Sequence, residues 1–291
     1  MTMSGFAGLR VLALESRRSS ELAKLIASYG GEPVVAPSMR EVPLESNLEA
    51  LAFAKALFAR EFDMVIFLTG VGTRALLGVV ETAYKREEYI AVLQRVKVVA
   101  RGPKPVAALR ELGITPAVTA PEPNTWRELL LALDEAGASR EELRLRGARV
   151  AVQEYGVSNP ELLSGLRERG AVVTRVPVYQ WALPEDLAPL QAAVKSLAAR
   201  EIDVVLFTTS VQIAHLFQIA GEMKLEAPVQ LGLRRAIVAS IGPTTSEELQ
   251  RRGIRPDLEP SHPKMGFLVK EAAEQSAELL RQKRQGMASA S

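Results

Sequence analysis

The chain has 291 residues, 47% of them hydrophobic and 24% charged, which is ordinary for a folded globular protein and excludes an intrinsically disordered chain. It contains no cysteine and two histidines, so disulfides, thiol nucleophiles, cysteine-bound zinc, iron–sulfur clusters and histidine-rich metal sites are excluded. The net charge of +2 argues against a general nucleic-acid binder. At roughly 150 residues per domain, the length predicts two domains.

The N-terminal residues lack the basic and apolar regions of a signal peptide. The apolar runs at 11–14, 64–68 and 204–207 are much shorter than the roughly 20 residues that span a bilayer. We therefore expect a cytoplasmic protein with no membrane segment. Residues 282–291 are small and polar, and we predict that they form a disordered tail.

Strands and helices alternate along the first half of the chain. An apolar run at 11–14 is followed by Leu22, Leu25 and Ile26 at helical spacing, and Gly30 ends that helix. The remaining predicted elements are an extended run at 33–37, a helix at 48–60, a strand at 64–68, a helix at 73–80, a strand at 96–100 and a helix at 103–112. Continuous apolar strands separated by helices are typical of parallel sheets that are covered on both faces.

The second half of the chain repeats this order. Residues 61–77 (EFDMVIFLTGVGTRALL) resemble residues 201–217 (EIDVVLFTTSVQIAHLF), and residues 100–116 resemble residues 240–256, both at an offset of 140. The segments GLRVLALE and GARVAVQE form a third pair at an offset of 139. Three pairs in the same order indicate an internal duplication. The sequence therefore predicts an α/β protein with two flavodoxin-like, doubly wound parallel-sheet domains.

Four loops that follow predicted strands are candidate binding segments, because ligands of such folds bind beyond the carboxyl ends of the strands. Each loop opens a helix, whose N-terminus favours anions such as phosphate or carboxylate. The candidate residues are Thr69, Gly70, Val71 and Gly72, then Gly102 and Lys104, then Thr208, Thr209 and Ser210, and finally Gly242, Thr244 and Thr245.

The same loops also have a purely structural interpretation. Serine and threonine before a helix commonly act as N-caps, and Thr244 with Glu247 or Thr245 with Glu248 has capping-box spacing. No dinucleotide or P-loop fingerprint is present, since the Gly70-Val71-Gly72 segment lacks the further glycine and no Gly-Lys-Ser/Thr sequence occurs.

Three further positions complete the set of candidates, and a fourth residue, His215, is set aside. Arg17 follows the first strand, where it can bind a carboxylate, although adjacent arginines are also common on solvated surfaces. Tyr155 occupies the equivalent loop of the second copy. Tyr179 follows a short strand and is either a packing residue or a phenol at a domain junction. We interpret His215, inside a helix, as structural.

Together these segments resemble the uroporphyrinogen-III synthase family. The resemblance covers roughly residues 8–270 and is carried by the segments Leu68–Thr73, Gly102–Pro105, Val178-Tyr179, Phe207–Ser210 and Gly242–Thr245. It implies two domains joined by a two-stranded linker. By similarity, residues 1–36 and 180–270 form the first domain, residues 41–174 form the inserted second domain, and residues 37–40 and 175–179 form the linker strands.

The resemblance also implies an activity. Such enzymes are lyases that convert hydroxymethylbilane into uroporphyrinogen III in the cleft between the domains, by loss of water, ring closure and inversion of the last pyrrole ring. They use no metal or organic cofactor, and their substrate carries eight carboxylates. Tyr179 matches the family position proposed for the acid, and Thr245 matches the threonine of the Gly-Pro-x-Thr turn. The chain departs from the pattern at Pro105, where that turn of the other copy would have threonine.

For partners, we expect a monomer that binds this small molecule, with no nucleic acid or membrane and with transient contacts to the preceding or following enzyme of tetrapyrrole synthesis. An alternative is a non-catalytic, synthase-like domain that senses a tetrapyrrole or another polycarboxylate. A two-domain racemase would need a pair of catalytic cysteines, and a periplasmic-type binding protein would need a signal peptide, so both are disfavoured.

Overall fold

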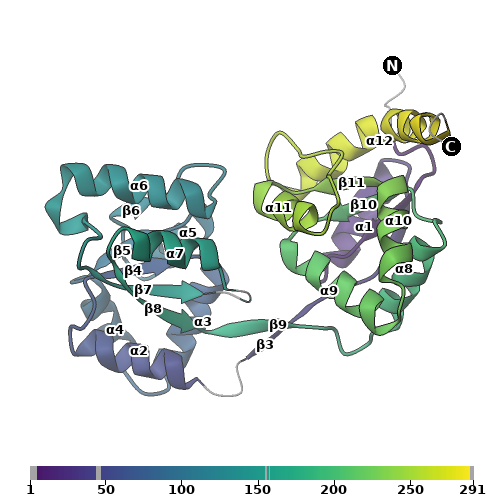
Figure 1. The fold of residues 1–291 in the computed structure, drawn as a ribbon. Helices are drawn as coiled ribbons and strands as arrows, with labels where there is room; N and C mark the ends of the chain where they lie inside the picture. The colour runs from purple at the N-terminus through teal and green to yellow at the C-terminus, as the bar shows by residue number, and fades with distance from the viewer. Residues whose placement is uncertain (1–4, 44–46, 155, 157, 289–291) are drawn as a thin grey trace. The chain divides into compact units, whose positions relative to one another are not determined.

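The chain forms two units, and its two ends belong to the same one. A computed structural model describes residues 5–43, 47–154, 156 and 158–288, without the side chains of Pro43 and residues 286–288. The first unit comprises Met1–Arg40 and Ala182–Ser291, and the second comprises Glu41–Trp181. Each contains a parallel sheet, which confirms the predicted α/β fold class (Figure 1).

The first unit contains a four-stranded parallel sheet in the order β11-β10-β1-β2. Its strands are β1 (Arg10–Ala13), β2 (Glu32–Val35), β10 (Val204–Phe207) and β11 (Ile237–Ser240). Its helices are α1 (Ser19–Ser28), α8 (Ala188–Ala198), α9 (Ser210–Glu222), α10 (Glu226–Arg235), α11 (Pro243–Arg251) and α12 (Met265–Ala288).

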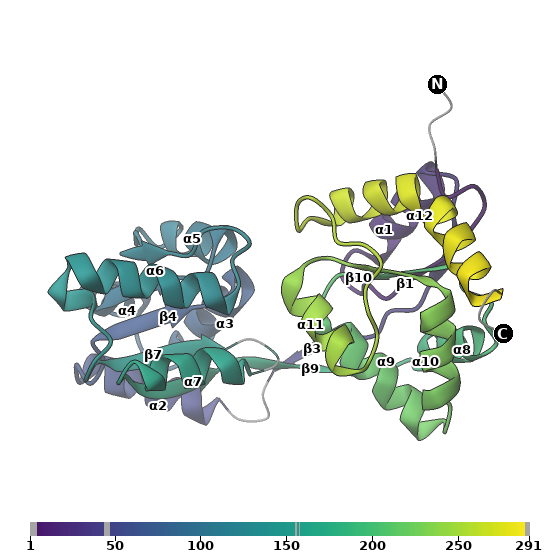
Figure 2. The same ribbon diagram turned by 45° about the horizontal axis from the view of Figure 1, so that its top comes forward.

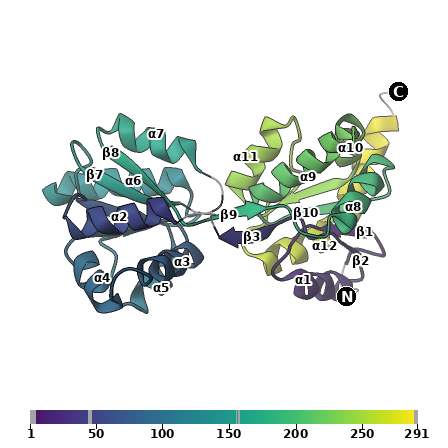
Figure 3. The same cartoon turned by 90° about the horizontal axis from the view of Figure 1, so that it is seen from below.

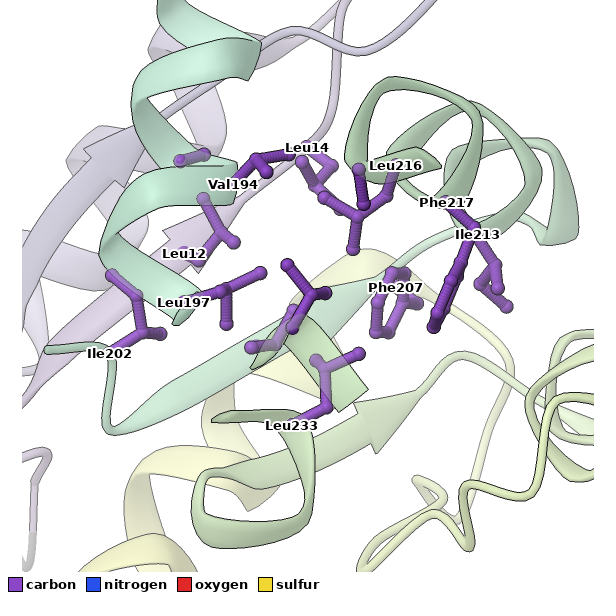
Figure 4. Close-up of a cluster of buried hydrophobic side chains, with 14 of the residues drawn as sticks. Leu12, Leu14, Val194, Leu197, Ile202, Phe207, Ile213, Leu216, Phe217 and Leu233 are labelled. Carbon is purple, nitrogen blue, oxygen red and sulfur yellow. The ribbon is translucent and has the colours of Figure 1, made fainter. Parts of the chain in front are cut away.

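Helices cover both faces of this sheet. One face packs against α8, α9, α10 and α11, and the other packs against α1 and α12 (Figure 2). The first interface is a continuous apolar layer in which Leu12 and Phe207 from the strands meet Leu197, Leu216 and Leu233 from the helices (Figure 4). Burial on both faces explains why these strands are continuously apolar and do not alternate with polar residues.

The second unit contains a five-stranded parallel sheet in the order β6-β5-β4-β7-β8. Its strands are β4 (Met64–Phe67), β5 (Lys97–Ala100), β6 (Val118–Thr119), β7 (Arg149–Glu154) and β8 (Val172–Pro177). Its α-helices are α2 (Leu48–Phe58), α3 (Gly70–Val80), α4 (Arg86–Leu93), α5 (Pro103–Arg110), α6 (Trp126–Ser139) and α7 (Pro160–Glu168), and Glu141–Leu143 forms a 3₁₀ turn.

This sheet is also covered on both faces. Helices α2, α3, α4 and α5 contribute to the apolar cluster on one face, and α6 and α7 contribute to the cluster on the other (Figure 3). Helix α6, which the sequence analysis did not predict, begins at a capping box in which Thr125 and Glu128 bond each other's backbone N–H groups. Among the described residues, no helix is long and apolar enough to cross a membrane.

The duplication is visible in the strand registers. Val204 pairs with Ile237 and Val11, and its equivalent Met64 pairs with Lys97 and Val150. These registers reproduce the sequence offsets of 140 and 139. Even the short β6 has a counterpart, because the parallel bridge from Ala239 to Leu258 corresponds to the pairing of Val99 with Val118. The two sheets therefore have one topology.

An aspartate joins the first two central strands in each copy. Asp63 accepts hydrogen bonds from the Arg149 backbone N–H (2.9 Å) and from its guanidinium (2.9 Å), and this side-chain bond holds the pKa of Asp63 below its ordinary value. Asp203 likewise accepts from the backbone N–H of Arg10 at 3.0 Å. Both aspartates precede their strands by one residue, so they fix the register at which the paired strands begin.

In each unit, the connections that follow two adjacent strands pass over opposite faces of the sheet. From β10 the chain continues through α9 and α10 to β11, whereas from β1 it continues through α1, on the opposite face, to β2. The adjacent strands β10 and β1 therefore define the topological switch point of the first unit, and β4 and β7 define that of the second. In open α/β sheets, ligands bind beyond the carboxyl ends of the strands at this point.

The linker strands lie further along the chain than predicted. An antiparallel pair forms between β3 (Arg40–Pro43) and β9 (Tyr179–Ala182), at the passages from one unit to the other. Residues 175–177, predicted to belong to the linker, instead end β8 in the five-stranded sheet. They stay in that sheet because β8 runs alongside β7 as far as the pair Glu154 and Pro177.

The predicted disordered tail at 282–291 is wrong for residues 282–288, which continue α12 as far as Ala288. Leu268, Ala272 and Leu280 pack this helix on the sheet. Near its end, Lys283 forms an ion pair with Asp257 (2.6 Å), and Arg284 forms one with Asp203 (2.7 Å). These apolar contacts and ion pairs hold the segment in the helix, although its small and polar residues are typical of a disordered end.

A close approach between two helices gives a stability prediction. A methyl group on Gly232, in α10, would lie 2.0 Å from the backbone oxygen of Leu197, in α8, so Gly232→Ala forces the helices apart. We expect a loss of about 1–3 kcal/mol in the free energy of unfolding, measured by chemical denaturation. Gly221→Ala is the control, because its methyl group meets nothing closer than 4.0 Å. Equal effects of the two substitutions would contradict the prediction.

Candidate functional site

The carboxyl edge of the first sheet brings three predicted loops together. Residues 13, 206 and 239 are aligned across β1, β10 and β11, so the loops after these strands begin side by side. They contain Arg17, then Thr208, Thr209 and Ser210, and then Gly242, Thr244 and Thr245. The structure therefore brings these predicted residues to one edge of the first unit.

A hydrogen-bond network crosses the switch point of this unit. The Thr208 hydroxyl donates to Glu15 Oε2 (2.7 Å), and Gln212 Nε2 donates to the same hydroxyl (2.8 Å). The backbone N–H of Thr208 donates to Gln212 Oε1 (2.8 Å). Gln212 is fully buried. Both polar groups of Thr208 thus make internal hydrogen bonds, and Glu15 and Gln212 are residues of this edge that the sequence analysis missed.

One signal in the sequence points to Glu15. The duplicated segments GLRVLALE and GARVAVQE both end in glutamate, at Glu15 and Glu154. A carboxylate kept at the carboxyl end of a central strand in both copies marks a position at the binding edge. The buried partner Gln212 carries no comparable signal, because only the fold shows that its side chain turns back to Thr208.

The start of α9 differs from that of its counterpart α3. Thr209 is the N-cap of α9, but its side chain makes no capping hydrogen bond. Thr69 is the N-cap of α3, and its hydroxyl accepts from the backbone N–H of Gly72 at 3.0 Å. The first turn of α9 therefore keeps backbone N–H groups that no side chain caps, which suits it to an anion.

Neither of the capping boxes that the spacing allowed forms at the start of α11. Gly242 is the N-cap and no side chain caps the helix. Pro243 takes the first helical position, which places Thr244 and Thr245 inside the first turn rather than ahead of it. Glu248 forms ion pairs with Arg252 (3.0 Å) and Arg251 instead. Thr244 is exposed, whereas Thr245 is buried at 4% exposure.

Arg17 is exposed, and its backbone N–H donates to Glu15 Oε1 at 3.2 Å. His215 hydrogen-bonds the backbone oxygen of Ser38 through Nδ1 at 2.7 Å, and Ser38 is itself hydrogen-bonded to the backbone oxygen of Leu14, which fits a structural role for the histidine. Within the described residues, no group of three or more His, Asp or Glu side chains is placed to hold a metal ion.

The carboxyl edge of the second sheet contains the glycine-rich turn. The α-carbon of Gly72 lies against Gln153, so that an added methyl group would fall 2.1 Å from Gln153 Nε2. A methyl group on Gly70 would fall 2.5 Å from the backbone oxygen of Lys104. Both glycines therefore serve close packing at the switch point, and of this turn only Val71 is exposed.

The start of α5 offers fewer N–H donors than the other helices of the two edges. Pro103 and Pro105 in its first turn have no N–H group, and Gly102 packs against Asn124. Lys104 is exposed and adds a positive charge there. An anion at the start of α5 would therefore interact mainly with the ammonium group of Lys104 and less with backbone N–H groups.

Glu154, the counterpart of Glu15, is buried and satisfied within its own unit. It accepts from Arg175 Nε (2.7 Å) and from the Ser158 hydroxyl (2.7 Å). Its side chain is only 5% exposed, so the arginine is the positive charge that neutralises it. Tyr155, a predicted site residue, lies outside the described residues.

Tyr179 lines a groove of the second unit. The ring is buried at 6% exposure and makes an edge-to-face contact with Trp181, with ring centroids 5.8 Å apart. The groove has a volume of about 430 Å³ and is formed mainly by α3 and the strands β3 and β9. Its apolar wall includes Val42, Val71 and Val178. Tyr179 is thus both a packing residue and part of a concave surface.

Comparisons with known proteins agree on one family. Residues 20–270 match the family model described as HEM4, uroporphyrinogen-III synthase HemD. The chain is 33% identical to the uncharacterized protein YjjA of Bacillus subtilis over 275 residues, covering 92% of this chain and 96% of that protein. It is 30% identical over 242 residues to a putative uroporphyrinogen-III synthase of Methanothermobacter thermautotrophicus, covering 81% and 87% of the two chains.

Solved structures show the same fold. A mutant uroporphyrinogen III synthase from Thermus thermophilus aligns with a TM-score of 0.70 at 23% identity, covering 95% of this chain and all of that one. A wild-type structure of that enzyme aligns with a TM-score of 0.55 at 24% identity, covering 94% of this chain and 99% of that one.

The contrast between the two N-caps gives a matched prediction. Thr69→Ala removes a capping hydrogen bond, and we expect it to lower the free energy of unfolding by about 0.5–2 kcal/mol. Thr209→Ala removes no such bond, and we expect a change within about 0.5 kcal/mol. Chemical denaturation of both variants measures the difference. A larger loss for Thr209→Ala would show that the assigned capping is incorrect.

Proposed function

Since the chain belongs to the uroporphyrinogen-III synthase family, we propose that it converts hydroxymethylbilane into uroporphyrinogen III. The reaction loses water, closes the macrocycle and inverts the last pyrrole ring. The observation that carries the proposal is the duplicated edge: helices α3, α5, α9 and α11 each begin at the carboxyl end of a strand of a parallel sheet. A linear substrate with carboxylates along its length suits such repeated helix N-termini.

The modest net charge of +2 requires local binding of a polyanion. We assign carboxylate binding to the N–H groups at the start of α9, where Thr209 and Ser210 lie, and to the turn at Gly242 and Thr244. In the second unit, Lys104 is the exposed positive charge at the equivalent edge. Arg17, exposed in the loop after β1, is a further proposed carboxylate-binding residue of the first unit. Backbone N–H groups bind carboxylates without the entropy loss that long side chains would suffer.

Tyr179 is the proposed acid. Departure of the substrate hydroxyl as water needs a proton, and the remaining cation is stabilised by the pyrrole nitrogen. Assistance by a positioned acid is typically worth about 10²–10⁴-fold. The groove that Tyr179 lines is apolar and is large enough for a heteroaromatic ring, and the buried phenol oxygen would have to turn toward it when substrate binds. Thr245 matches the family position, and its burial suits it to holding the α11 turn more than to direct contact.

The reaction as written needs no cofactor, because it is a loss of water followed by carbon–carbon bond formation within one molecule. We propose that the protein acts in the cytoplasm as a monomer, with transient contacts to neighbouring enzymes of tetrapyrrole synthesis. Control of the ring that attacks is the main task of the enzyme. An unguided intermediate closes without inversion, so positioning of the substrate determines the product.

The isomer of the product tests the function. Purified protein supplied with freshly made hydroxymethylbilane is expected to give mainly the type III isomer, identified by chromatography after oxidation to uroporphyrin. The control is the same mixture without protein, which gives the uninverted type I isomer. Type I alone in both mixtures would overturn the proposal. Tight binding of uroporphyrin with no type III product would instead favour the non-catalytic sensor.

The role of Tyr179 is tested by removing its hydroxyl alone. We expect Tyr179→Phe to reduce kcat about 10²-fold or more while the melting temperature stays near that of the wild type. Tyr89→Phe is the matched control, because Tyr89 belongs to the same apolar cluster, and burial holds the pKa of its phenol far above the usual range. Equal kcat values for wild type and Tyr179→Phe would remove Tyr179 from proton transfer.

A further inference from the structure

Glu15 lies at the switch point of the first unit, two residues after the end of the central strand β1. Its neighbour across the switch point is Thr208, directly after β10. This is the place where open α/β sheets bind their ligands. A carboxylate here is unexpected in a protein proposed to bind a polyanion, since like charges repel. Its presence needs a reason other than binding the substrate carboxylates.

The donor and acceptor of each hydrogen bond around Glu15 can be assigned. An ionised carboxylate only accepts, so the Thr208 hydroxyl must donate to Glu15. The hydroxyl oxygen then accepts from Gln212 Nε2, which leaves Gln212 Oε1 to accept from the Thr208 backbone N–H. The Arg17 backbone N–H donates to the other oxygen of Glu15. This chain of donors ends on Glu15, holds it in place and stabilises its negative charge.

Comparison with the second unit shows that this carboxylate lacks the arginine hydrogen bond of its equivalent. Its equivalent Glu154 is buried and neutralised by Arg175. At the offset of 140, the residue in the position of Arg175 is Val35, so the first unit has no arginine there. Among the described residues no ion pair is formed by Glu15, and its side chain is partly exposed. The first unit thus presents an oriented, partly exposed carboxylate that forms no ion pair of its own in the described part of the chain, with Arg18 near enough to interact with it electrostatically.

We propose that Glu15 binds a pyrrole N–H of the bilane and stabilises the positive charge that forms when the hydroxyl leaves. This inference rests on the proposed function. In that step the carbon–oxygen bond breaks, and the hydroxide leaves as water after accepting a proton from a general acid. The π electrons of the pyrrole ring shift to form the new exocyclic carbon–carbon double bond, and the lone pair of the nitrogen forms a carbon–nitrogen double bond, so the N–H carries the positive charge. Glu15 accepts a hydrogen bond from that N–H and takes no proton.

A carboxylate in this role acts mainly in the transition state. Before the hydroxyl leaves, the pyrrole N–H is neutral, and Glu15 also repels the substrate carboxylates. After the hydroxyl leaves, the hydrogen bond joins two opposite charges and becomes stronger. Interactions that strengthen only in the transition state raise kcat without lowering KM. Thr208 and Gln212 are then positioning residues, which hold Glu15 and do not touch the substrate.

The test is Glu15→Gln, which removes the charge and keeps an oxygen that can accept from Thr208. We expect kcat for type III formation to fall about 10- to 100-fold, the factor for a charge-assisted hydrogen bond, while KM stays the same or falls. Glu141→Gln is the control, because Glu141 is exposed and pairs with Arg144 on the surface of the second unit. Its kcat should remain that of the wild type.

Thr208→Val provides a second variant that keeps the charge of Glu15 and removes the hydroxyl that orients it. We expect a smaller fall in kcat than for Glu15→Gln, with KM unchanged. Melting temperatures are measured for each variant. A wild-type kcat in Glu15→Gln, or a rise in KM with no change in kcat, would overturn the proposal for Glu15 alone. Absence of type III product from the wild type would overturn the proposed function, and the role of Glu15 with it.

Discussion

The parallel pairing of β10 with β1 is the contact on which the first unit depends. It joins strands from opposite ends of the chain, with Val11 opposite Val204, and the hydrogen bond from Arg10 to Asp203 fixes where the pairing begins. Without this pairing the unit has no continuous sheet, because β1 and β2 come from one end of the chain and β10 and β11 from the other. The same pairing creates the switch point and places Thr208 beside Glu15.

The two copies share this topology but have diverged at the edges where ligands bind. In the second unit the switch point is filled: Gln153 packs on Gly72, Thr69 caps its helix and Arg175 neutralises Glu154. In the first unit no side chain caps α9, and Val35 stands where Arg175 pairs with the carboxylate in the other copy. Duplication therefore gave two equivalent surfaces, and substitutions at a few positions made them chemically different.

Each unit combines a rigid sheet with loops that carry the chemistry. Strands buried on both faces leave little freedom at their carboxyl ends, so residues one or two positions later are held in place by the sheet. Gln212 extends this order into the loop after β10, because its buried side chain bonds both polar groups of Thr208. Preorganised groups of this kind stabilise charge without reorganising during the reaction.

The sequence by itself determined the α/β class, the duplication and the family, because apolar runs, helical spacing and repeats are local patterns along the chain. It also placed the candidate loops at Thr69, Gly102, Thr208 and Gly242. Only the tertiary structure decided which groups of those loops are available, because it buries Thr245 and uses the Thr208 hydroxyl in an internal hydrogen bond. It also decided that residues 282–288, which have the composition of a disordered end, form the last turns of α12. Burial and hydrogen-bond partners depend on contacts between residues nearly 200 positions apart, such as Glu15 and Thr208, which no local pattern contains.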